Sequence, residues 1–185
     1  MADLSLVRPL SESGFQVRTA QARTIVRLKS WRGASANRAT LALGGCTLPD
    51  SVGKVTEGLP RILCTAPDEW LLVYTPTSVV RLRNILAPEL SAQSLVLVDL
   101  TDGLAVVEVS GTGVRDVMAR SCGLDLDPQQ FKAGECARTR FAQIPVVIDC
   151  VQDPGVFRLY TPRSYAVWLT DWLNDASIGL EGLPP

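Results

Sequence analysis

The chain has 185 residues, of which 46% are hydrophobic and 20% are charged. This length and composition predict one domain, or two closely fused halves, with a substantial core, and they exclude a disordered protein. Histidine is absent. Its absence excludes a histidine general base and the Ser-His-Asp and Cys-His arrangements of nucleophilic catalysis on this chain.

The formal net charge of −1 is distributed unevenly along the sequence. Residues 1–40 contain seven Arg or Lys against Asp3 and Glu12, a balance of +5, whereas the rest of the chain has a balance of −6. The basic stretch is either a solvated face or a surface that docks on an acidic partner. Nucleic acid is not expected as a partner, because these arginines are not regularly interleaved with aromatic residues.

Cysteine usage and hydropathy indicate the compartment. The five cysteines form no CxxC motif and no close pair, and most lie within apolar runs: Cys46, Cys64, Cys122, Cys136 and Cys150. We therefore expect reduced core thiols, which fit a reducing compartment, rather than ligands or disulfides. No segment approaches the ~18 apolar residues needed to cross a bilayer, and the first residues do not read as a signal peptide. We expect a cytoplasmic protein without membrane contact.

The first half of the chain is predicted to form strands followed by one helix. Residues 1–20 show no sustained period and are expected to be an N-terminal tail that frays or lies along another element. Alternating and branched residues predict four strands: Arg23 to Trp31, Ala39 to Leu43, Arg61 to Thr65 and Trp70 to Tyr74. Residues 47–58 read as a polar loop or hairpin. Thr75-Pro76 predicts the start of an amphipathic helix, which Pro88 is expected to end.

The most strongly patterned stretch runs from Leu95 to Gly123 and reads as strand, tight turn, strand and helix. Two apolar strands flank the turn Thr101-Asp102-Gly103. Ser110-Gly111-Thr112-Gly113 breaks the second strand and offers two hydroxyl caps for the helix. One face of that helix is predicted to carry Val114, Val117, Met118 and Cys122, and Gly123 is the expected C-terminal stop.

After an irregular connection that ends at Gly134, the chain is predicted to form three more strands and a helix. The strands are Cys136 to Ala142, Ile144 to Cys150 and Val156 to Tyr160. Pro145 favours a sheet edge for the second of them. Thr161-Pro162 is expected to cap the last helix, and residues 177–185 form a C-terminal tail. One face of this helix is predicted to carry Tyr165, Trp168, Leu169, Trp172 and Leu173.

An internal echo predicts the architecture. Residues 73–78, VYTPTS, recur 86 residues later as LYTPRS, and each copy ends a strand and begins a helix. The sequence therefore predicts an α+β fold of two similar strand-strand-helix halves, with helices packed on mixed or antiparallel sheets. The domain would span residues 21–176, with halves at about 21–90 and 91–176 that share a sheet. A six-residue match also arises by chance, since Thr-Pro is a common helix opening.

Two features of the sequence are candidates for ligand binding. The turn at 110–113 lies between a strand and a helix, as phosphate cradles do, but Asp116 stands where a third glycine is needed and no lysine follows. We interpret it as a plain strand-to-helix turn. Asp99, in an apolar strand, could hold a polar heterocycle or an amine, or could accept hydrogen bonds from the turn that follows. We favour the turn.

The remaining candidates favour structural roles. Asp125 and Asp127 precede Pro128 in a polar connection and read as solvated turn residues. Trp168 and Trp172 follow the spacing of a helical core, so we predict packing rather than a stacking platform, and the same for Trp70. The sequence predicts no catalytic, cofactor-binding or metal-binding residue on this chain.

The order of motifs resembles a known family. Val98 to Gly103, then Val109-Ser110-Gly111 and a helix, resemble the folate-binding aminomethyltransferase family. The sequence resembles the gamma subunits of heterotetrameric sarcosine oxidase more closely than it resembles the aminomethyltransferases. Four stretches of the sequence carry this likeness: Pro67 to Leu72, Val98 to Gly103, Cys122 to Pro128, and Pro162 to Ala166 with Trp172-Leu173. The resemblance covers roughly residues 60–175.

One departure from the aminomethyltransferase pattern affects function. That family follows the strand after Gly134 with a Gly-rich turn and an Asp-Asp pair that holds the folate and the amine. Here the region runs Ala142 to Val146, shorter and without the pair, and Asp149 comes too late to replace it. The resemblance therefore implies the scaffold of a folate enzyme without its own catalytic site.

The resemblance implies a non-catalytic gamma subunit in the heterotetramer that oxidatively demethylates sarcosine to glycine, with one-carbon transfer to tetrahydrofolate. FAD, FMN, NAD and tetrahydrofolate would belong to the partner alpha, beta and delta subunits, and this chain would serve assembly and cavity shaping. Two alternatives stay open: an autonomous folate-binding or one-carbon-transfer protein, and a free-standing homo-oligomeric binding module.

Overall fold

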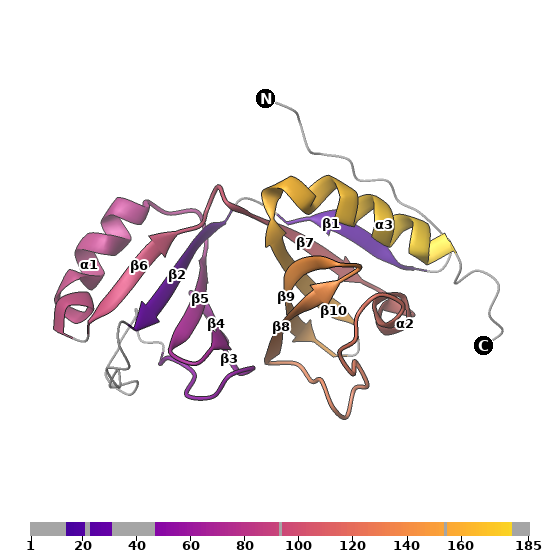
Figure 1. The fold of residues 1–185 in the computed structure, drawn as a ribbon, viewed down its shortest axis with the longest axis horizontal. Helices are drawn as coiled ribbons and strands as arrows, with labels where there is room; N and C mark the ends of the chain where they lie inside the picture. Colours follow the sequence, from indigo (N-terminus) through magenta and orange to yellow (C-terminus); the bar gives the residue numbers. More distant parts are fainter. Residues whose placement is uncertain (1–13, 21–22, 31–46, 93, 154, 179–185) are drawn as a thin grey trace. The chain divides into compact units, whose positions relative to one another are not determined.

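The computed structural model describes residues 14–20, 23–30, 47–92, 94–153 and 155–178. The predicted strand Ala39 to Leu43 and Cys46 lie outside these residues. The fold is α+β, and its strands form two separate five-stranded sheets, each with its own helices (Figure 1). Each sheet belongs to one of two compact units, and each unit is described on its own below.

Unit 2, residues 21–104 with Gly134–Cys136, is built on the sheet β3-β4-β5-β2-β6, in which every neighbouring pair is antiparallel. Its elements are β2 (Thr24–Ser30), β3 (Val55–Thr56), β4 (Arg61–Ala66), β5 (Glu69–Tyr74), α1 (Val79–Ala92) and β6 (Leu95–Asp99). The four predicted strands that fall within the described residues of this unit are therefore confirmed. Alternate apolar residues of each strand belong to one core cluster, which also includes Leu86 of α1.

The core of unit 2 lies between this sheet and α1. It comprises Val26, Leu28, Leu48, Ile62, Cys64, Trp70, Leu72, Leu86, Leu95 and Leu97. Trp70 is fully buried, and its indole Nε1–H donates to the Pro49 carbonyl oxygen at 2.9 Å, which satisfies its polar atom. The packing role predicted for Trp70 is confirmed.

Helix α1 differs from its prediction at both ends. It starts at Val79 rather than after Thr75, because the Ser78 hydroxyl accepts a hydrogen bond from the Arg81 N–H at 3.4 Å and serves as the cap. Pro88 does not end the helix, which continues to Ala92. Leu90 beyond the proline packs against the core, and this contact favours continuation of the helix.

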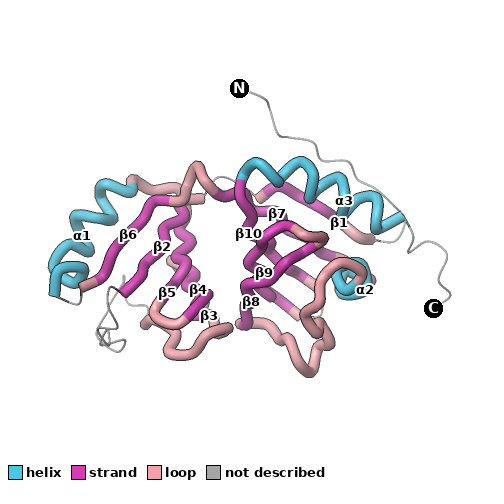
Figure 2. Tube along the Cα trace, viewed as in Figure 1, coloured by secondary structure: helices cyan, strands magenta, loops and turns pink. Residues whose placement is uncertain are grey.

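Unit 1 contains the remaining described elements, on the sheet β1-β7-β10-β9-β8. They are β1 (Gln16–Thr19), β7 (Leu104–Ser110), α2 (Val114–Ala119), β8 (Glu135–Phe141), β9 (Ile144–Gln152), β10 (Val156–Pro162), a 3-10 turn (Arg163–Tyr165) and α3 (Ala166–Ile178). Its core contains the predicted helix face Val114, Val117, Met118 and Cys122, together with Leu169 and Leu173 of α3. The residues between α2 and β8 form a long loop (Figure 2).

Two sequence expectations about the sheets are corrected. The two halves do not share a sheet, because β6 and β7, on either side of Thr101-Asp102-Gly103, belong to different sheets. Strand β9, which contains Pro145, is an inner strand between β10 and β8. Pro145 is tolerated there because it is the second residue of the strand, before the register with β10 begins at Val147.

Helix α3 starts later than predicted. Thr161 and Pro162 still belong to β10, and the Thr161 hydroxyl donates to the Pro145 carbonyl oxygen at 3.1 Å instead of capping the helix. The 3-10 turn then leads into Ala166. Trp172 packs edge-on against Phe141, with ring centroids 5.2 Å apart. Trp168 is 43% exposed, so the core packing predicted for it is wrong.

The two units repeat the same arrangement with one exchange of strands. By their order in the sheets, four strands of unit 2 correspond to four strands of unit 1: β3 to β8, β4 to β9, β5 to β10 and β2 to β7. Helix α1 corresponds to α3. The fifth position is filled differently. In unit 2 it is taken by β6, which follows α1, whereas in unit 1 it is taken by β1, which precedes β2 in the chain. Gln16–Thr19 of the predicted tail therefore lies along another element, antiparallel to β7.

Candidate functional site

The turn between β7 and α2 borders an open hollow. The hollow has a volume of about 760 Å³ and lies within unit 1. It is lined by the turn Gly111–Gly113, the first turns of α2, the loop Leu126–Pro128 and the β9–β10 turn with Gln152, Asp153 and Gly155. The turn at residues 110–113 is the one that the sequence analysis considered as a phosphate-binding turn and interpreted as a plain strand-to-helix turn.

Glycine is required at the start of this turn for a geometric reason. Gly111 has φ +107°, and a Cβ on it would lie 2.0 Å from the Gly14 carbonyl oxygen. The segment before β1 therefore passes directly over the turn. Gly113, with φ +73°, occupies the cap position of α2, and no side chain caps the helix. The two hydroxyl caps predicted at Ser110 and Thr112 are therefore not used.

The backbone donors that a phosphate would need are partly engaged. The Gly111 N–H donates to the Gly155 carbonyl oxygen at 3.2 Å, and the Val117 N–H donates to the Gly113 carbonyl oxygen at 3.0 Å. Asp116 adds a negative charge in the first turn of α2. These contacts agree with a strand-to-helix turn.

Arg115 is the centre of the polar contacts beside the hollow. Its Nη1 donates to the carbonyl oxygens of Leu126 and Phe131, and its Nη2 donates to Oδ1 of Asp153. Its guanidinium also lies over the Phe157 ring, 4.9 Å from the centroid. One side chain thus joins α2, the long loop and the β9–β10 turn.

Asp153 completes this network. While Oδ1 accepts from Arg115, its Oδ2 accepts from the Ala133 N–H at 3.0 Å. Arg115 and Asp153 were not identified from the sequence, because they are far apart in the chain and belong to no motif. The one sequence feature that pointed to Arg115 was its position on a short helix beside three core residues, Val114, Val117 and Met118.

Cys150 is the nucleophilic atom nearest to this network, and it is held in its thiol form. Burial, reinforced by the carboxylate of Asp153 and partly opposed by Arg115, raises the pKa of Cys150 from 9.0 to about 11. A thiol with this pKa is a poor nucleophile at neutral pH. Four cysteines are described, and all are buried and free, which confirms the predicted core thiols: Cys64, Cys122, Cys136 and Cys150.

The other sequence candidates lie apart from the hollow or in structural roles. Asp99 is exposed at the end of β6, and its Oδ1 accepts from the Thr101 N–H at 2.9 Å, which confirms the turn interpretation. Oδ1 of Asp125 accepts from the Asp127 N–H at 3.0 Å, and Oδ1 of Asp127 accepts from the Gln129 N–H at 2.7 Å. Both aspartates are exposed turn residues, as predicted.

The region in which the aminomethyltransferase pattern expects an acidic pair forms a two-residue turn. Ala142 and Gln143, between β8 and β9, both have positive φ, +43° and +75°. Asp149 lies farther along β9, fully buried, and its Oδ2 accepts from the Tyr160 hydroxyl at 3.4 Å. This turn therefore does not supply the acidic pair. Among the described residues, no group of three or more Cys, Asp or Glu side chains could hold a metal ion.

Known structures share this fold. The glycine cleavage system aminomethyltransferase T of Bartonella henselae superposes with a TM-score of 0.63 at 12% identity, over 87% of this chain and 45% of that chain. A chain of the heterotetrameric sarcosine oxidase of Corynebacterium sp. U-96 superposes with a TM-score of 0.83 at 25% identity, over 95% of this chain and 90% of that one. The α+β fold is thus that of an aminomethyltransferase-like scaffold.

The sequence comparisons identify the family. The model of the sarcosine oxidase gamma subunit family matches residues 32–179. The sarcosine oxidase gamma subunit of an Arthrobacter species is 31% identical over 157 residues, which is 83% of this chain and 75% of that protein. That of Corynebacterium sp. strain U-96 is 26% identical over 167 residues, 89% of this chain and 80% of that protein. The chain belongs to the sarcosine oxidase gamma subunit family.

Proposed function

We propose that this chain is the non-catalytic gamma subunit of a heterotetrameric sarcosine oxidase, which oxidatively demethylates sarcosine to glycine and passes the one-carbon unit to tetrahydrofolate. The observation that carries the proposal is the superposition, over nearly the whole length of both chains, on a chain of an assembled heterotetramer. The family match over residues 32–179 supports the same reading.

The contacts of the polar residues support a structural role. The guanidinium of Arg115 bonds to two backbone carbonyls and to Asp153, so it joins α2 to the long loop and to the β9–β10 turn within unit 1. The thiol of Cys150 is protonated at neutral pH. With no histidine in the chain, these groups offer neither a general base nor an activated nucleophile. The role that fits such a chain is assembly of the complex and shaping of an internal cavity.

The cofactors of the reaction belong, in this proposal, to the alpha, beta and delta subunits: FAD, FMN, NAD and tetrahydrofolate. A folate site on this chain would need the acidic pair that the Ala142–Gln143 turn does not supply. The donor set at that turn therefore does not fit folate. Among the described residues, no helix has the length and apolar character of a membrane span. The buried free thiols are consistent with the cytoplasm.

The proposal is tested by co-expressing the tagged chain with the reading frames for the other three subunits. We expect a yellow complex that contains this chain in fixed ratio and demethylates sarcosine. Omission of the chain should lower the yield of assembled complex. Full assembly and full activity without it would contradict the proposal.

The autonomous alternative has its own measurement. Calorimetry of the isolated chain with a reduced folate should detect no tight binding, because the acidic pair is missing from the β8–β9 turn. Tight binding, together with turnover of a methylated amine by the isolated chain, would favour an independent one-carbon enzyme.

A further inference from the structure

The outer side of α3 exposes large apolar side chains. Val167 is 58% exposed and Trp168 is 43% exposed, and Tyr165 and Ile178 are also exposed. Four of the nine exposed large hydrophobic side chains among the described residues thus lie in one segment of fourteen residues. Singly exposed apolar residues are ordinary, but a cluster that includes a tryptophan is typical of an interaction surface.

Helical spacing places these residues opposite the core. Ala166, Leu169, Leu173 and Ser177 are buried, at steps of three or four residues. The five exposed residues of α3 recur with the same spacing on the other side, and we call them the α3 stripe: Val167, Trp168, Asp171, Asp175 and Ile178. The stripe is therefore a continuous strip along the whole helix, which lies at the outside of unit 1 (Figure 1).

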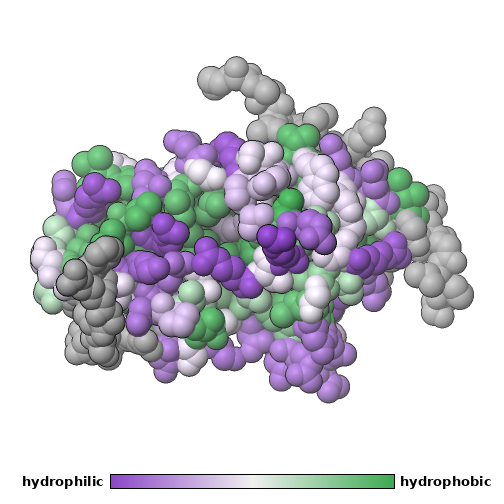
Figure 3. Space-filling view, viewed as in Figure 1, coloured by the Kyte–Doolittle hydropathy of each residue, from purple (hydrophilic) through white to green (hydrophobic). Residues whose placement is uncertain are grey.

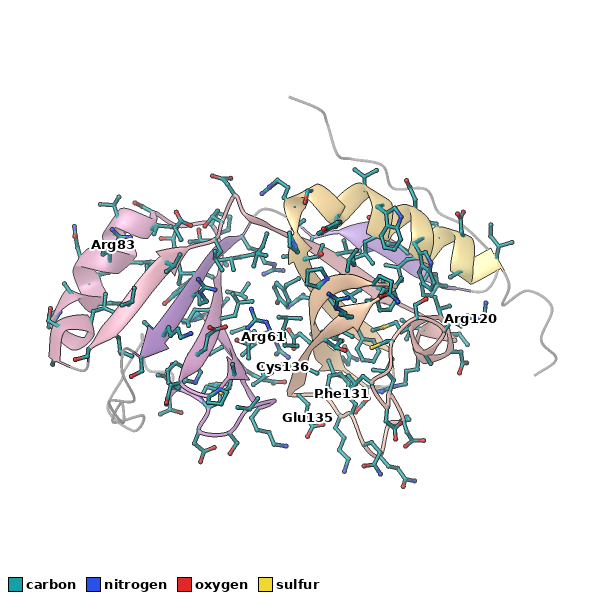
Figure 4. The ribbon with its side chains drawn as sticks, viewed as in Figure 1. Arg61, Arg83, Arg120, Phe131, Glu135 and Cys136 are labelled. Atoms are coloured by element: carbon teal, nitrogen blue, oxygen red, sulfur yellow. The ribbon has the colours of Figure 1, made fainter. Side chains whose placement is uncertain are left out.

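The charge of the α3 stripe indicates which kind of partner surface is complementary to it. Both charged residues of α3 are acidic, Asp171 and Asp175, and the helix contains no Lys or Arg. The C-terminal turn obtains its cation from elsewhere, because Nη1 of Arg120, just after α2, donates to the Ala176 carbonyl oxygen at 3.0 Å (Figure 4). A surface complementary to the stripe is apolar with flanking positive charges.

The corresponding helix of unit 2 has the opposite character. Helix α1 also exposes large apolar residues, Val80 and Ile85, but two of its three charged residues are basic: Arg81 and Arg83 are exposed, and the third is Glu89. Arg83 is labelled in Figure 4. The two helices hold equivalent places in the repeat, but only in α3 are all the charged residues acidic. Over the face shown in Figure 3, hydrophobic and hydrophilic residues are intermixed.

We infer that the α3 stripe docks on a larger subunit of the complex, through an apolar segment of that subunit that carries arginine or lysine side chains. One cation would stack on the Trp168 ring, and others would pair with Asp171 and Asp175. This inference rests on the proposed function, since it presupposes a complex. It assigns the surface and the chemistry of the partner.

A thiol-protection experiment tests the location. Val167→Cys and Val52→Cys place single thiols at positions of nearly equal exposure, 58% and 55%, on α3 and on a loop of unit 2. In the isolated chain both should react with a maleimide at similar rates above the wild-type background. In the co-expressed complex, Val167→Cys should react at least about tenfold more slowly, with Val52→Cys unchanged within about twofold. Equal rates for Val167→Cys in both states, or equal protection of both positions, would overturn the inference.

Affinity measurements test the chemistry. Trp168→Ser should raise the Kd for the remaining subunits at least about 30-fold, the size typical of a central aromatic anchor. The double reversal Asp171→Lys with Asp175→Lys should weaken binding at low salt by about tenfold or more and invert the salt dependence of the wild type, because salt then screens a repulsion. Ile85→Ser, on the exposed side of α1, is the control and should change the Kd less than about threefold.

The outcomes separate the two proposals. If the wild-type chain does not join the complex, the proposed function fails. If it does join, and Trp168→Ser binds as the wild type does, only the docking surface is wrong. A second copy of this chain is the other possible occupant. Sedimentation that shows self-association broken by Trp168→Ser, with binding to the other subunits intact, would overturn the inference in favour of that occupant.

Discussion

Substitution of Arg115 by methionine should destabilise unit 1 more than any single charge change on the surface. The variant keeps most of the aliphatic length of the side chain and removes every donor. It leaves the carbonyl oxygens of Leu126 and Phe131 without this partner, and it removes the ion pair with Asp153 and the contact over Phe157.

The magnitude follows from the burial of each partner. Hydrogen bonds from a charged donor contribute about 1.5–3 kcal/mol each, and Leu126 and Phe131 are buried. The side chain of Asp153 is 38% exposed, so its ion pair contributes at most about 1 kcal/mol. The cation–π contact adds about 0.5–1 kcal/mol. Because contacts of one side chain are not additive, we expect a total loss of about 3–5 kcal/mol.

Urea unfolding followed by tryptophan fluorescence measures this loss, with Trp172 as a probe in unit 1. Arg83→Met is the matched control, because Arg83 is exposed on α1, and it should change the free energy of unfolding by less than about 0.5 kcal/mol. A loss below about 1 kcal/mol for Arg115→Met would refute the assigned role of the Arg115 contacts.

Three further substitutions test single features. Gly111→Ala places a methyl group against the Gly14 carbonyl oxygen at positive φ and should lower the free energy of unfolding by about 2–4 kcal/mol. The control Gly123→Ala, with open space around it, should change the free energy of unfolding by less than about 1 kcal/mol. Equal effects of the two substitutions would contradict the close approach of Gly14 to Gly111. The thiol of Cys150 has its pKa raised to about 11, so the unfolded chain loses this proton first, near its ordinary value, and stability falls as the pH rises through that window. Cys150→Ala should flatten this fall by up to about 2–3 kcal/mol in urea unfolding at increasing pH; an unchanged slope would disprove it. Trp70→Phe removes the indole donor and should cost about 1–2 kcal/mol in thermal unfolding; an unaltered Tm would show that the bond contributes nothing.

The sequence predicted the strands well because they are short runs of apolar residues bounded by turn formers. The strand from Thr24 and the hairpin of β4 and β5 are examples, and they are buried along almost their whole length. The short helix after Gly113 was predicted for a related reason, since Val114, Val117 and Met118 share one face. Local periodicity reports which side of an element is buried.

Features decided by distant partners were not predicted. Thr161 has the appearance of a helix cap, but its hydroxyl bonds to a carbonyl on the neighbouring strand β9. Trp168 has core spacing relative to Tyr165 and Trp172, yet it lies on the exposed side of α3, in the α3 stripe. The contact between Arg115 and Asp153 depends on how a loop and a turn meet, and no local pattern encodes it.

The origin of β1 has a consequence for how the chain is made. Gln16 pairs with Ser110, so the first described strand must wait for roughly 90 further residues before its partner exists. Such distant pairing raises the entropic cost of folding and slows it. Unit 2, whose strands lie almost wholly between residues 24 and 99, can acquire its shape while the ribosome is still adding the remainder. A circular permutant that moves residues 14–20 behind α3 would give both halves the same element order, and it should fold faster than the natural connectivity.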